Sequence, residues 1–563
     1  MASEASAPPV QAPDPSGITN VQTQGVDEGG IVKVHGTHLV VLRRGRLFTI
    51  DTSGGDLRPV AAVDAFAGKG GGAAWYDEML VSGDLVIVIG YNYGRQGTEV
   101  NRFRIDDAGT LTFVDTHHLR SEDYYSSENY ASRLIGTRLI VYSPRPFRYR
   151  EKDRRDFEEA LPGVRRWSGD DNAAFTPLAT PRRVYAAQML LGSPQRANVN
   201  TAHTVTDCDL ARADLDCRAT VVLGSDSRNF YVSGNAVYVW TADALRTGNA
   251  REKDKAILYR IPLDGRPPQA IGAYGSPIDQ FSFLERDGRL NVLVEEGGSG
   301  EGMWRSTLPG NGLALLRLPL RWMGRGDRMV PASAWQMLPH GDDNQGYVQN
   351  RFVGDTLLYG YTPYSWKREK FTGANLHAVS IGSRAVTAIA TDAGVTRIDA
   401  MGRDAIVIGN VAGQGLAFDA IDLSGTPRRQ DRYILPAARE GENRSHAFFY
   451  RPDNADGTSG ILGLPVATAL TRPEARFLGS GSAIFFLNRD DRRLSPAGQL
   501  DADERGAVQD NCLASCTDWY GNARPIFLGD RIIALMGYEL VEGRRENGQI
   551  REVRRINFAP AAR

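Results

Sequence analysis

Residues 79–89 read MLVSGDLVIVI, two short apolar runs joined by the pair Gly83-Asp84. Glycine supplies the positive φ that a two-residue β-hairpin turn requires, and Asp favours turns through its side-chain hydrogen bonds. Each apolar run has the length of a β-strand rather than of a helix. The stretch therefore predicts a tight β-hairpin.

The same phrase recurs along the chain. Pairs of turn residues precede strand-length, mostly apolar runs at nine positions, which begin at Gly36, Gly83, Gly136, Gly234, Asp287, Gly354, Gly402, Gly481 and Gly529. Third and fourth runs follow several copies, as at residues 46–51 and 111–114. Neighbouring hairpins begin about 45 to 100 residues apart, in several cases close to the period of a four-stranded propeller blade.

A small four-stranded sheet buries both of its faces only by stacking between neighbours, and stacking around an axis leaves only short edges. The predicted fold is therefore all-β, a β-propeller of about eight four-stranded antiparallel blades, with seven to nine compatible with the repeat. We expect residues 18–563 to form this single domain. Residues 1–17, MASEASAPPVQAPDPSG, are small, polar and Pro-rich, which is typical of a flexible tether.

Two segments interrupt the repeat. Residues 148–167, RYREKDRRDFEEALPGVRRW, are dense in mixed charge and predict one short charged helix, solvated on the surface or serving as a docking site. Residues 192–218 predict a second loop insertion. Both are expected to lie outside the regular blades.

Composition excludes several classes of function. Hydrophobic residues make up 42% and charged residues 24% of the chain, which is typical of a globular protein. The 66 basic and 67 acidic residues leave a net charge of -1, so the chain lacks the positive excess that nucleic-acid binding requires. No apolar run approaches the about 20 residues of a transmembrane helix, and the first residues lack the features of a signal peptide. If the protein is exported, its signal is not part of this sequence.

The cysteines form two local pairs, Cys208 with Cys217 and Cys512 with Cys516. Each pair lies in a loop-like stretch, which predicts two small disulfide-closed loops and an oxidising compartment. Four free thiols in a cytosolic protein are the alternative. A zinc site is disfavoured because no second Cys or His pair lies nearby at ligand spacing.

Polar residues stand shortly before several hairpins, where the innermost strand of each blade should begin. Because innermost strands line the channel of a propeller, we expect these side chains to converge on the axis. They form either a ligand-binding ring or a structural set that satisfies buried polar groups and channel water, and we favour the structural role. The set consists of Asp27, Glu28, Glu78, Ser132, Arg133, Asn229, Gln280, Arg351 and His446.

Four members of this set are the candidates for catalysis: Asp27, Glu28, Arg351 and His446. His446 is the first choice for an acid, a base or a metal ligand. Asp27 and Glu28 are adjacent on a predicted strand and should point to opposite faces, so they are not expected to share a proton. The sequence contains no Gly-x-Ser-x-Gly, His-Glu-x-x-His or P-loop motif.

No cofactor and no metal ion are predicted. Residues 342–344, Asp-Asp-Asn, and residues 501–504, Asp-Ala-Asp-Glu, supply oxygen ligands of the kind that calcium prefers. Neither segment has EF-hand spacing, so solvated loop charge is the favoured interpretation and calcium the alternative.

The opening phrase, residues 19–33, reads TNVQTQGVDEGGIVK. It resembles the start of a bacterial and archaeal family of secreted proteins with a C-terminal β-propeller domain. Similar phrases follow in order at residues 78–84, 132–136, 229–233, 350–355 and 446–450, so the resemblance spans nearly the whole chain. Where the family reads Asp-Glu-Ala-Asp, this chain has Asp27-Glu28-Gly29-Gly30. The resemblance implies export and a propeller, but no particular reaction.

The favoured function is an exported, non-enzymatic binding or scaffold propeller, secreted or periplasmic, with a protein, peptide or glycan partner in the envelope. A lipid anchor upstream of residue 1 would fit the tether. Aromatic residues in loop-like segments are the expected contacts: Tyr124, Tyr125, Trp167, Tyr361, Tyr364 and Trp366. The alternatives are a hydrolase or lyase with its substrate in the channel, and a metal-stabilised structural subunit of an envelope assembly.

Overall fold

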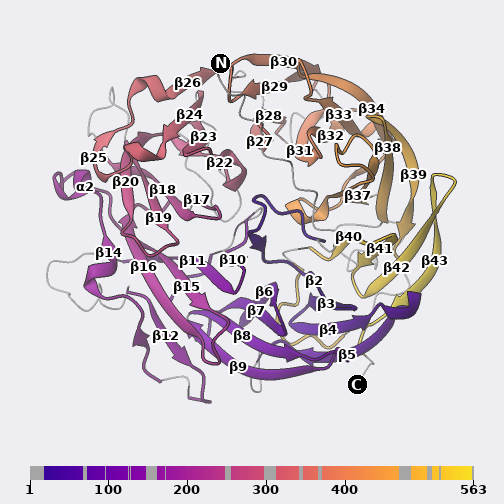
Figure 1. The fold of residues 1–563 in the computed structure, drawn as a ribbon, viewed down its shortest axis with the longest axis horizontal. Helices are drawn as coiled ribbons and strands as arrows, with labels where there is room; N and C mark the ends of the chain where they lie inside the picture. Colours follow the sequence, from indigo (N-terminus) through magenta and orange to yellow (C-terminus); the bar gives the residue numbers. More distant parts are fainter. Residues whose placement is uncertain are drawn as a thin grey trace, which may run out of the picture.

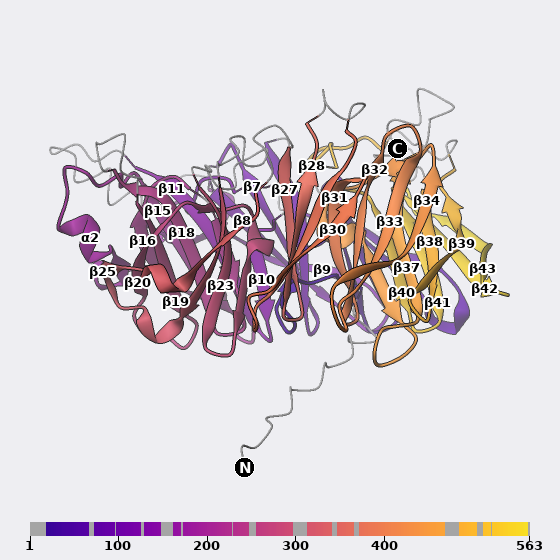
Figure 2. The ribbon, with the colours of Figure 1, turned by 90° about the horizontal axis from the view of Figure 1, so that it is seen from above.

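The structure is a ring of sheets around a central axis (Figure 1), and its side view is a thick disc (Figure 2). The computed structural model describes residues 18–66, 73–95, 97–124, 126, 129–147, 161–170, 173–227, 229–246, 255–296, 312–340, 346–364, 371–467, 483–503, 510–518 and 521–560. Nine sheets form within these residues. The predicted β-propeller is confirmed, and the number of blades is at the upper end of the predicted range.

Blades 1 to 5 follow one another along the chain. Blade 1 contains β2 (Val32–His35), β3 (His38–Arg43), β4 (Arg46–Asp51) and β5 (Arg58–Asp64). Blade 2 contains β6 (Ala74–Ser82), β7 (Leu85–Asn92), β8 (Gly97–Ile105), β9 (Leu111–Leu119), β12 (Gly163–Arg166) and β13 (Thr176–Pro177). Blade 3 contains β1 (Asp27–Glu28), β10 (Ser132–Ile135), β11 (Arg138–Pro146), β15 (Thr201–Asp209), β16 (Asp216–Gly224) and β14 (Val184–Tyr185). Blade 4 contains β17 (Asn229–Val232), β18 (Ala236–Leu245), β19 (Lys255–Pro262), β20 (Gln269–Tyr274) and β25 (Arg325–Met329). Blade 5 contains β21 (Ser276–Pro277), β22 (Phe283–Arg286), β23 (Arg289–Glu295), β24 (Leu313–Pro319) and β26 (Trp335–Leu338).

Blades 6 to 9 complete the ring. Blade 6 contains β27 (Tyr347–Val353), β28 (Thr356–Thr362), β29 (Ala374–Ser380) and β30 (Val386–Thr391). Blade 7 contains β31 (Gly394–Met401), β32 (Asp404–Val411), β33 (Gly415–Asp422) and β34 (Arg428–Pro436). Blade 8 contains β35 (Arg439–Glu440), β36 (Phe449–Pro452), β37 (Gly460–Ala467), β38 (Ala483–Asp490) and β39 (Arg493–Asp501). Blade 9 contains β40 (Ala523–Leu528), β41 (Arg531–Met536), β42 (Glu539–Glu546) and β43 (Gln549–Asn557).

The hydrophobic core lies between the blades. Strand residues alternate between the two faces of a sheet, and both faces of each blade are buried against neighbours. Val40 of blade 1 packs with Met79 of blade 2, for example, and Leu416 of blade 7 with Leu464 of blade 8. A core of this kind explains why the strands read as nearly continuous apolar runs rather than as alternating ones.

The tight turns agree with the sequence at most positions. Gly83 has a φ of 56°, and β6 and β7 pair with Ser82 opposite Leu85, so Gly83 and Asp84 form a two-residue turn. Blade 8 departs from the prediction. Its inner hairpin joins β36 and β37 and carries Gly457, with a φ of 68°. The predicted turn at residues 481 and 482 lies outside the described residues and precedes β38.

The two predicted insertions differ from expectation. Residues 148–160 lie outside the described residues. Within the rest of the predicted helix, Gly163–Arg166 forms β12, which lies between β9 and β13 in blade 2. Residues 192–218 are not a single loop insertion, because Thr201–Asp209 form β15 and residues 216–218 begin β16, two full strands of blade 3. The one α-helix in the described part of the chain is α2 (Gln188–Leu191), and it carries no charged side chain.

Both predicted disulfides are present. Cys208 and Cys217 face each other across β15 and β16, and Cys512 and Cys516 close a short loop before blade 9. The described residues include no helix with the length and hydropathy needed to span a bilayer.

Blade 9 packs directly against blade 1 to close the ring. In the described residues, blade 1 is built only from residues 32–64 and blade 9 only from residues 523–557, so no strand is exchanged between them. Leu39 and Phe48 of blade 1 contact Ile533 and Leu540 of blade 9 in one buried cluster. We call this junction the seam.

Candidate functional site in the central channel

The first described residues run through the centre of the ring (Figure 1). We call residues 18–30 the N-terminal plug. Asn20 donates to Asp399 Oδ1 at 2.9 Å and to the Ser445 carbonyl at 3.2 Å. Gln22 donates to the Gln280 carbonyl at 2.6 Å, and Thr23 is 3.1 Å from the Tyr231 hydroxyl. The plug thus bonds to blades 4, 5, 7 and 8 before its own chain reaches blade 1.

The plug continues by extending two sheets. Asp27 and Glu28 form β1, which pairs with β10 of blade 3. Gly30 exchanges two backbone hydrogen bonds with Met79 of blade 2. The first strand of blade 1, β2, follows directly. The plug therefore contacts blades that lie far from it in sequence.

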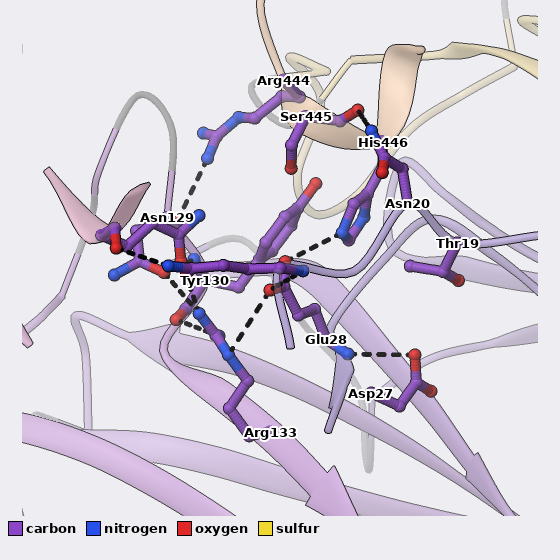
Figure 3. A network of polar contacts seen from close by, with 12 residues as sticks. Thr19, Asn20, Asp27, Glu28, Asn129, Tyr130, Arg133, Arg444, Ser445 and His446 are labelled. Atoms are coloured by element: carbon purple, nitrogen blue, oxygen red, sulfur yellow. Dashed lines mark hydrogen bonds and ion pairs between the residues drawn. The ribbon is translucent and has the colours of Figure 1, made fainter. Parts of the chain in front are cut away.

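Glu28 and His446 meet at the end of the plug (Figure 3). His446 Nε2 lies 3.0 Å from Glu28 Oε2, and the two residues are 4% and 1% exposed. Burial lowers the pKa of His446 to about 4, and this effect outweighs the attraction of the Glu28 charge. Burial raises the pKa of Glu28, but Arg133 and the hydrogen bond from His446 bring it down to about 2. At neutral pH the pair is therefore a carboxylate that accepts a hydrogen bond from Nε2–H of a neutral imidazole.

Tyr130 and Arg133 support this pair. The Tyr130 ring stacks on His446 with centroids 4.7 Å apart and an angle of 13° between the planes. Arg133 Nε lies 3.9 Å from Glu28 Oε1. Its Nη atoms donate to the Tyr130 and Ser132 carbonyls, to Asn129 Oδ1 at 2.6 Å and to Gln280 Oε1 at 2.7 Å. Arg133 is thus fully engaged in holding channel loops together.

Glu78 and Ser132 form a second buried polar contact. Glu78 accepts from the Ala131 and Ser132 backbone N–H groups at 2.8 and 3.0 Å and from the Ser132 hydroxyl at 2.5 Å. Burial raises the pKa of Glu78 despite these bonds. Gly29 lies directly over the carboxylate, since a Cβ at this position would be 2.8 Å from Glu78 Oε2.

The remaining predicted channel residues point into separate contacts. Arg351 pairs with Asp399 at 3.0 Å and lies 4.6 Å from the centre of the Phe281 ring. Asp27 pairs with Lys33 at 2.7 Å. Asn229 donates to the Pro277 carbonyl at 2.5 Å. Of the four catalytic candidates, the structure brings together only Glu28 and His446, and Asp27 and Glu28 contact different partners.

Several channel residues were missing from the sequence-based set. Asp399 also pairs with Arg397 at 3.2 Å, and Arg524 pairs with Glu442 at 2.8 Å. Asp399 and Arg524 stand shortly before the turns at Gly402 and Gly529, the same position that identified Glu78, so the signal was present. Asn20 gave no such signal, because it precedes the first blade.

Three of the four predicted surface aromatics that lie within the described residues are not on the surface. Tyr124, Tyr361 and Tyr364 are buried, and Tyr124 packs edge-on against Tyr142 and Phe230. These three tyrosines therefore form core contacts, because their segments lie within or beside blades. Trp167 is half-buried under Arg95. Tyr125 and Trp366 lie outside the described residues.

The structure describes only part of the two calcium candidates. No group of three or more His, Cys, Asp or Glu side chains in the described ranges is placed to hold a metal ion. Residues 342–344 and 504 of the two calcium candidates lie outside those ranges. The described acidic residues of the second candidate have protein contacts, since Asp501 accepts from Gln499 and the Asp503 N–H donates to Glu539.

The chain is similar to several known proteins at low identity, and one family model matches it. No curated protein matches the chain in sequence. Among solved structures, the β-propeller domain of the Trilobed protease from Pyrococcus furiosus is 9% identical with a TM-score of 0.30, over 77% of this chain and 98% of that one. Hsv2 from Kluyvelomyces marxianus is 6% identical with a TM-score of 0.29, over 74% and 95%. The acylaminoacyl peptidase from Pyrococcus horikoshii is 9% identical with a TM-score of 0.28. The match covers 79% of this chain and 58% of the peptidase. A family model described as a beta propeller domain matches residues 16–357, more than half of the sequence. The chain therefore belongs to the beta propeller domain family.

Proposed function

We propose that the protein is an exported, non-enzymatic binding or scaffold propeller, secreted or periplasmic, which presents its outer surfaces to a protein or glycan. The observation that carries this proposal is the N-terminal plug. Asn20, Gln22 and Glu28 occupy the place where a substrate would sit in an open channel, and they bond to the channel residues themselves. The polar ring is therefore used for stability, which leaves the outside of the ring for recognition.

The two disulfides support export. Such bonds persist in oxidising compartments and are rare in the cytosol of mesophiles. Fractionation of the source organism tests this part of the proposal, because the protein should be found outside the cytoplasm. Thiol labelling without reductant should leave all four cysteines unmodified.

One observation favours a second candidate function, an acid–base enzyme. A neutral histidine held by a carboxylate is an arrangement that general bases use. His446 Nδ1 faces Gly30, where a Cβ would be 3.5 Å away, so no side chain of residue 30 covers this nitrogen. Turnover would require the plug to leave the channel.

The experiment compares wild type with the His446→Asn variant. The immobilised protein is incubated with an envelope extract of the source organism, cross-linked and analysed by mass spectrometry, and both proteins are assayed with chromogenic ester, peptide and glycoside substrates. We expect one stoichiometric partner, cross-linked at the outer surface, that both proteins retain. Hydrolysis by wild type that is lost in His446→Asn would instead establish the enzyme.

A further inference from the structure

A cluster of three arginines lies between blades 5 and 6, away from the channel. Arg289 and Arg317 belong to β23 and β24, and Arg384 belongs to the turn between β29 and β30. Asn291 is opposite Arg317 in the sheet, and Arg289 is two residues from Asn291, so these three side chains leave the same face of blade 5.

This face looks toward blade 6. Gln336 of β26 is opposite Leu315, two residues from Arg317, which places Gln336 on the same face. Gln336 Nε2 donates to the Arg384 carbonyl at 2.8 Å, and Arg384 Nη2 donates to the Ser333 carbonyl at 3.4 Å. The Arg384 turn is thus fixed against the face that carries the other two arginines.

The three guanidinium groups have no acidic partner within the described ranges. Burial lowers the pKa of Arg317, and the charges of Arg384 and Arg289 lower it further. A guanidinium nevertheless keeps its proton at any physiological pH, so the positive charges remain side by side. Arg432 of blade 7, by contrast, is neutralised by Asp392 and Asp419.

An unpaired donor lies at the same place. Arg317 Nε is buried and forms no hydrogen bond to another described residue. Buried donors are normally paired, so the coincidence of this one with unneutralised charge indicates a place where a hydrogen-bond acceptor binds.

We propose that Arg289, Arg317 and Arg384 bind a phosphate or sulfate group. Several guanidinium forks match the oxygens of a tetrahedral oxyanion, and such charge-assisted bonds would remove the mutual repulsion. The group belongs to a small anion or to an anionic lipid headgroup, and both offer the same oxygens. This site is independent of the proposed function.

Calorimetric titration of the full chain with inorganic phosphate and with sulfate, at low ionic strength, tests the proposal. Wild type should bind saturably, and Arg317→Met should weaken binding at least tenfold. Arg551→Met is the matched control, because Arg551 is an exposed arginine on β43 away from this cluster, and it should bind as wild type does. Phosphate should raise the melting temperature of wild type and Arg551→Met but not of Arg317→Met.

Two further measurements complete the test. If Arg317→Met fails to fold, Arg289→Gln and Arg384→Gln replace it, because both side chains are exposed. Each should weaken phosphate binding at least tenfold. Sedimentation with vesicles that contain phosphatidic acid, compared with phosphatidylcholine vesicles, distinguishes a lipid headgroup from a small anion. Sedimentation with phosphatidic acid that depends on Arg317 indicates a lipid headgroup. Phosphate binding without such sedimentation indicates a small anion. Absence of saturable phosphate and sulfate binding, or equal affinity in wild type and all cluster variants, would overturn the proposal.

Discussion

His446 is a histidine that the fold keeps neutral and aligned. Its ring lies between Tyr130 on one face and the Glu28 carboxylate at one edge. Glu28 in turn has its charge balanced by Arg133 rather than by His446, whose pKa is lowered by burial. The residues around this pair determine the protonation of each member, and stability should therefore depend on pH.

The first prediction concerns that dependence. His446 has a pKa of about 4 in the folded protein and near 6.5 when unfolded, so the unfolded state binds more protons between these values. The contribution of His446 to the free energy of unfolding is complete above pH 6.5 and is lost as the pH falls toward 4. Glu28, with a folded pKa of about 2, loses its own contribution only below about pH 4.5. Denaturant titrations should show wild type losing about 2 to 3 kcal/mol of unfolding free energy from pH 7 to 4.5 through His446.

His446→Gln should lack this loss, whatever its absolute stability. Its unfolding free energy should be flatter between pH 7 and 4.5 than that of wild type. Equal slopes for the two proteins would show that the histidine is not held neutral.

The second prediction concerns Gly29 and Gly30. A Cβ at Gly29 would lie 2.8 Å from Glu78 Oε2 and 2.9 Å from Ser132 Oγ, so Gly29→Ala must displace a buried hydrogen-bonded pair. Overpacking of this kind costs about 1 to 3 kcal/mol. At Gly30 the nearest atom would be His446 Nδ1 at 3.5 Å, an ordinary contact, so Gly30→Ala should change stability by less than about 0.5 kcal/mol. Thermal unfolding of Gly29→Ala and Gly30→Ala measures this difference. Similar losses of unfolding free energy in the two variants would contradict the tight packing over Glu78.

At the scale of elements, local segments could be predicted from sequence and long-range ones could not. The hairpin at Gly83 is fixed by neighbouring residues, so a turn pair between apolar runs was enough to predict it. The plug was not predicted, because the bond from Asn20 to Asp399 joins residues 379 positions apart. The cysteines predict a loop at residues 192–218, but Cys208 and Cys217 lie opposite each other within a strand pair.

Residues 510–516, which include the loop closed by Cys512 and Cys516, contact blades 1, 2 and 9. Asp510 pairs with Arg44 of blade 1 at 2.8 Å, and the Ser515 hydroxyl accepts from the Tyr76 N–H of blade 2 at 2.5 Å. The loop precedes blade 9 in sequence, so it reaches across the seam before the chain returns to blade 9. Its disulfide should therefore stabilise the seam specifically.

The third prediction compares the two disulfides. Replacing both Cys512 and Cys516 by Ser should cost about 2 kcal/mol from the lost loop constraint. Amide exchange should then increase in blades 1 and 9, measured by mass spectrometry. The control, Cys208→Ala with Cys217→Ala, should cost a similar amount but increase exchange in β15 and β16. If both variants opened the same strands, the loop would not be part of the seam.

At the scale of the molecule, the ring has one junction that differs from the others. Along the chain, each blade leads into the next, so eight junctions are joined by a connecting segment. The seam is held instead by the Leu39 to Leu540 cluster, by hydrogen bonds from Arg531 to the Thr52 and Asp56 carbonyls, and by the disulfide loop and the plug. Opening at the seam therefore separates no covalent neighbours, and the two terminal blades should be the first to exchange.

The fourth prediction tests this with two matched cavities. Leu540 in β42 and Leu416 in β33 are both fully buried on third strands, one at the seam and one between blades 7 and 8. Truncation of either to Ala should cost about 2 to 5 kcal/mol. Leu540→Ala should raise amide exchange across all of blades 1 and 9, because only non-covalent contacts oppose their separation. Leu416→Ala should raise it near the cavity alone, since the connection through residues 437–448 keeps blades 7 and 8 adjacent. A local effect in both variants would mean that the plug and the disulfide loop close the ring as firmly as the chain itself does.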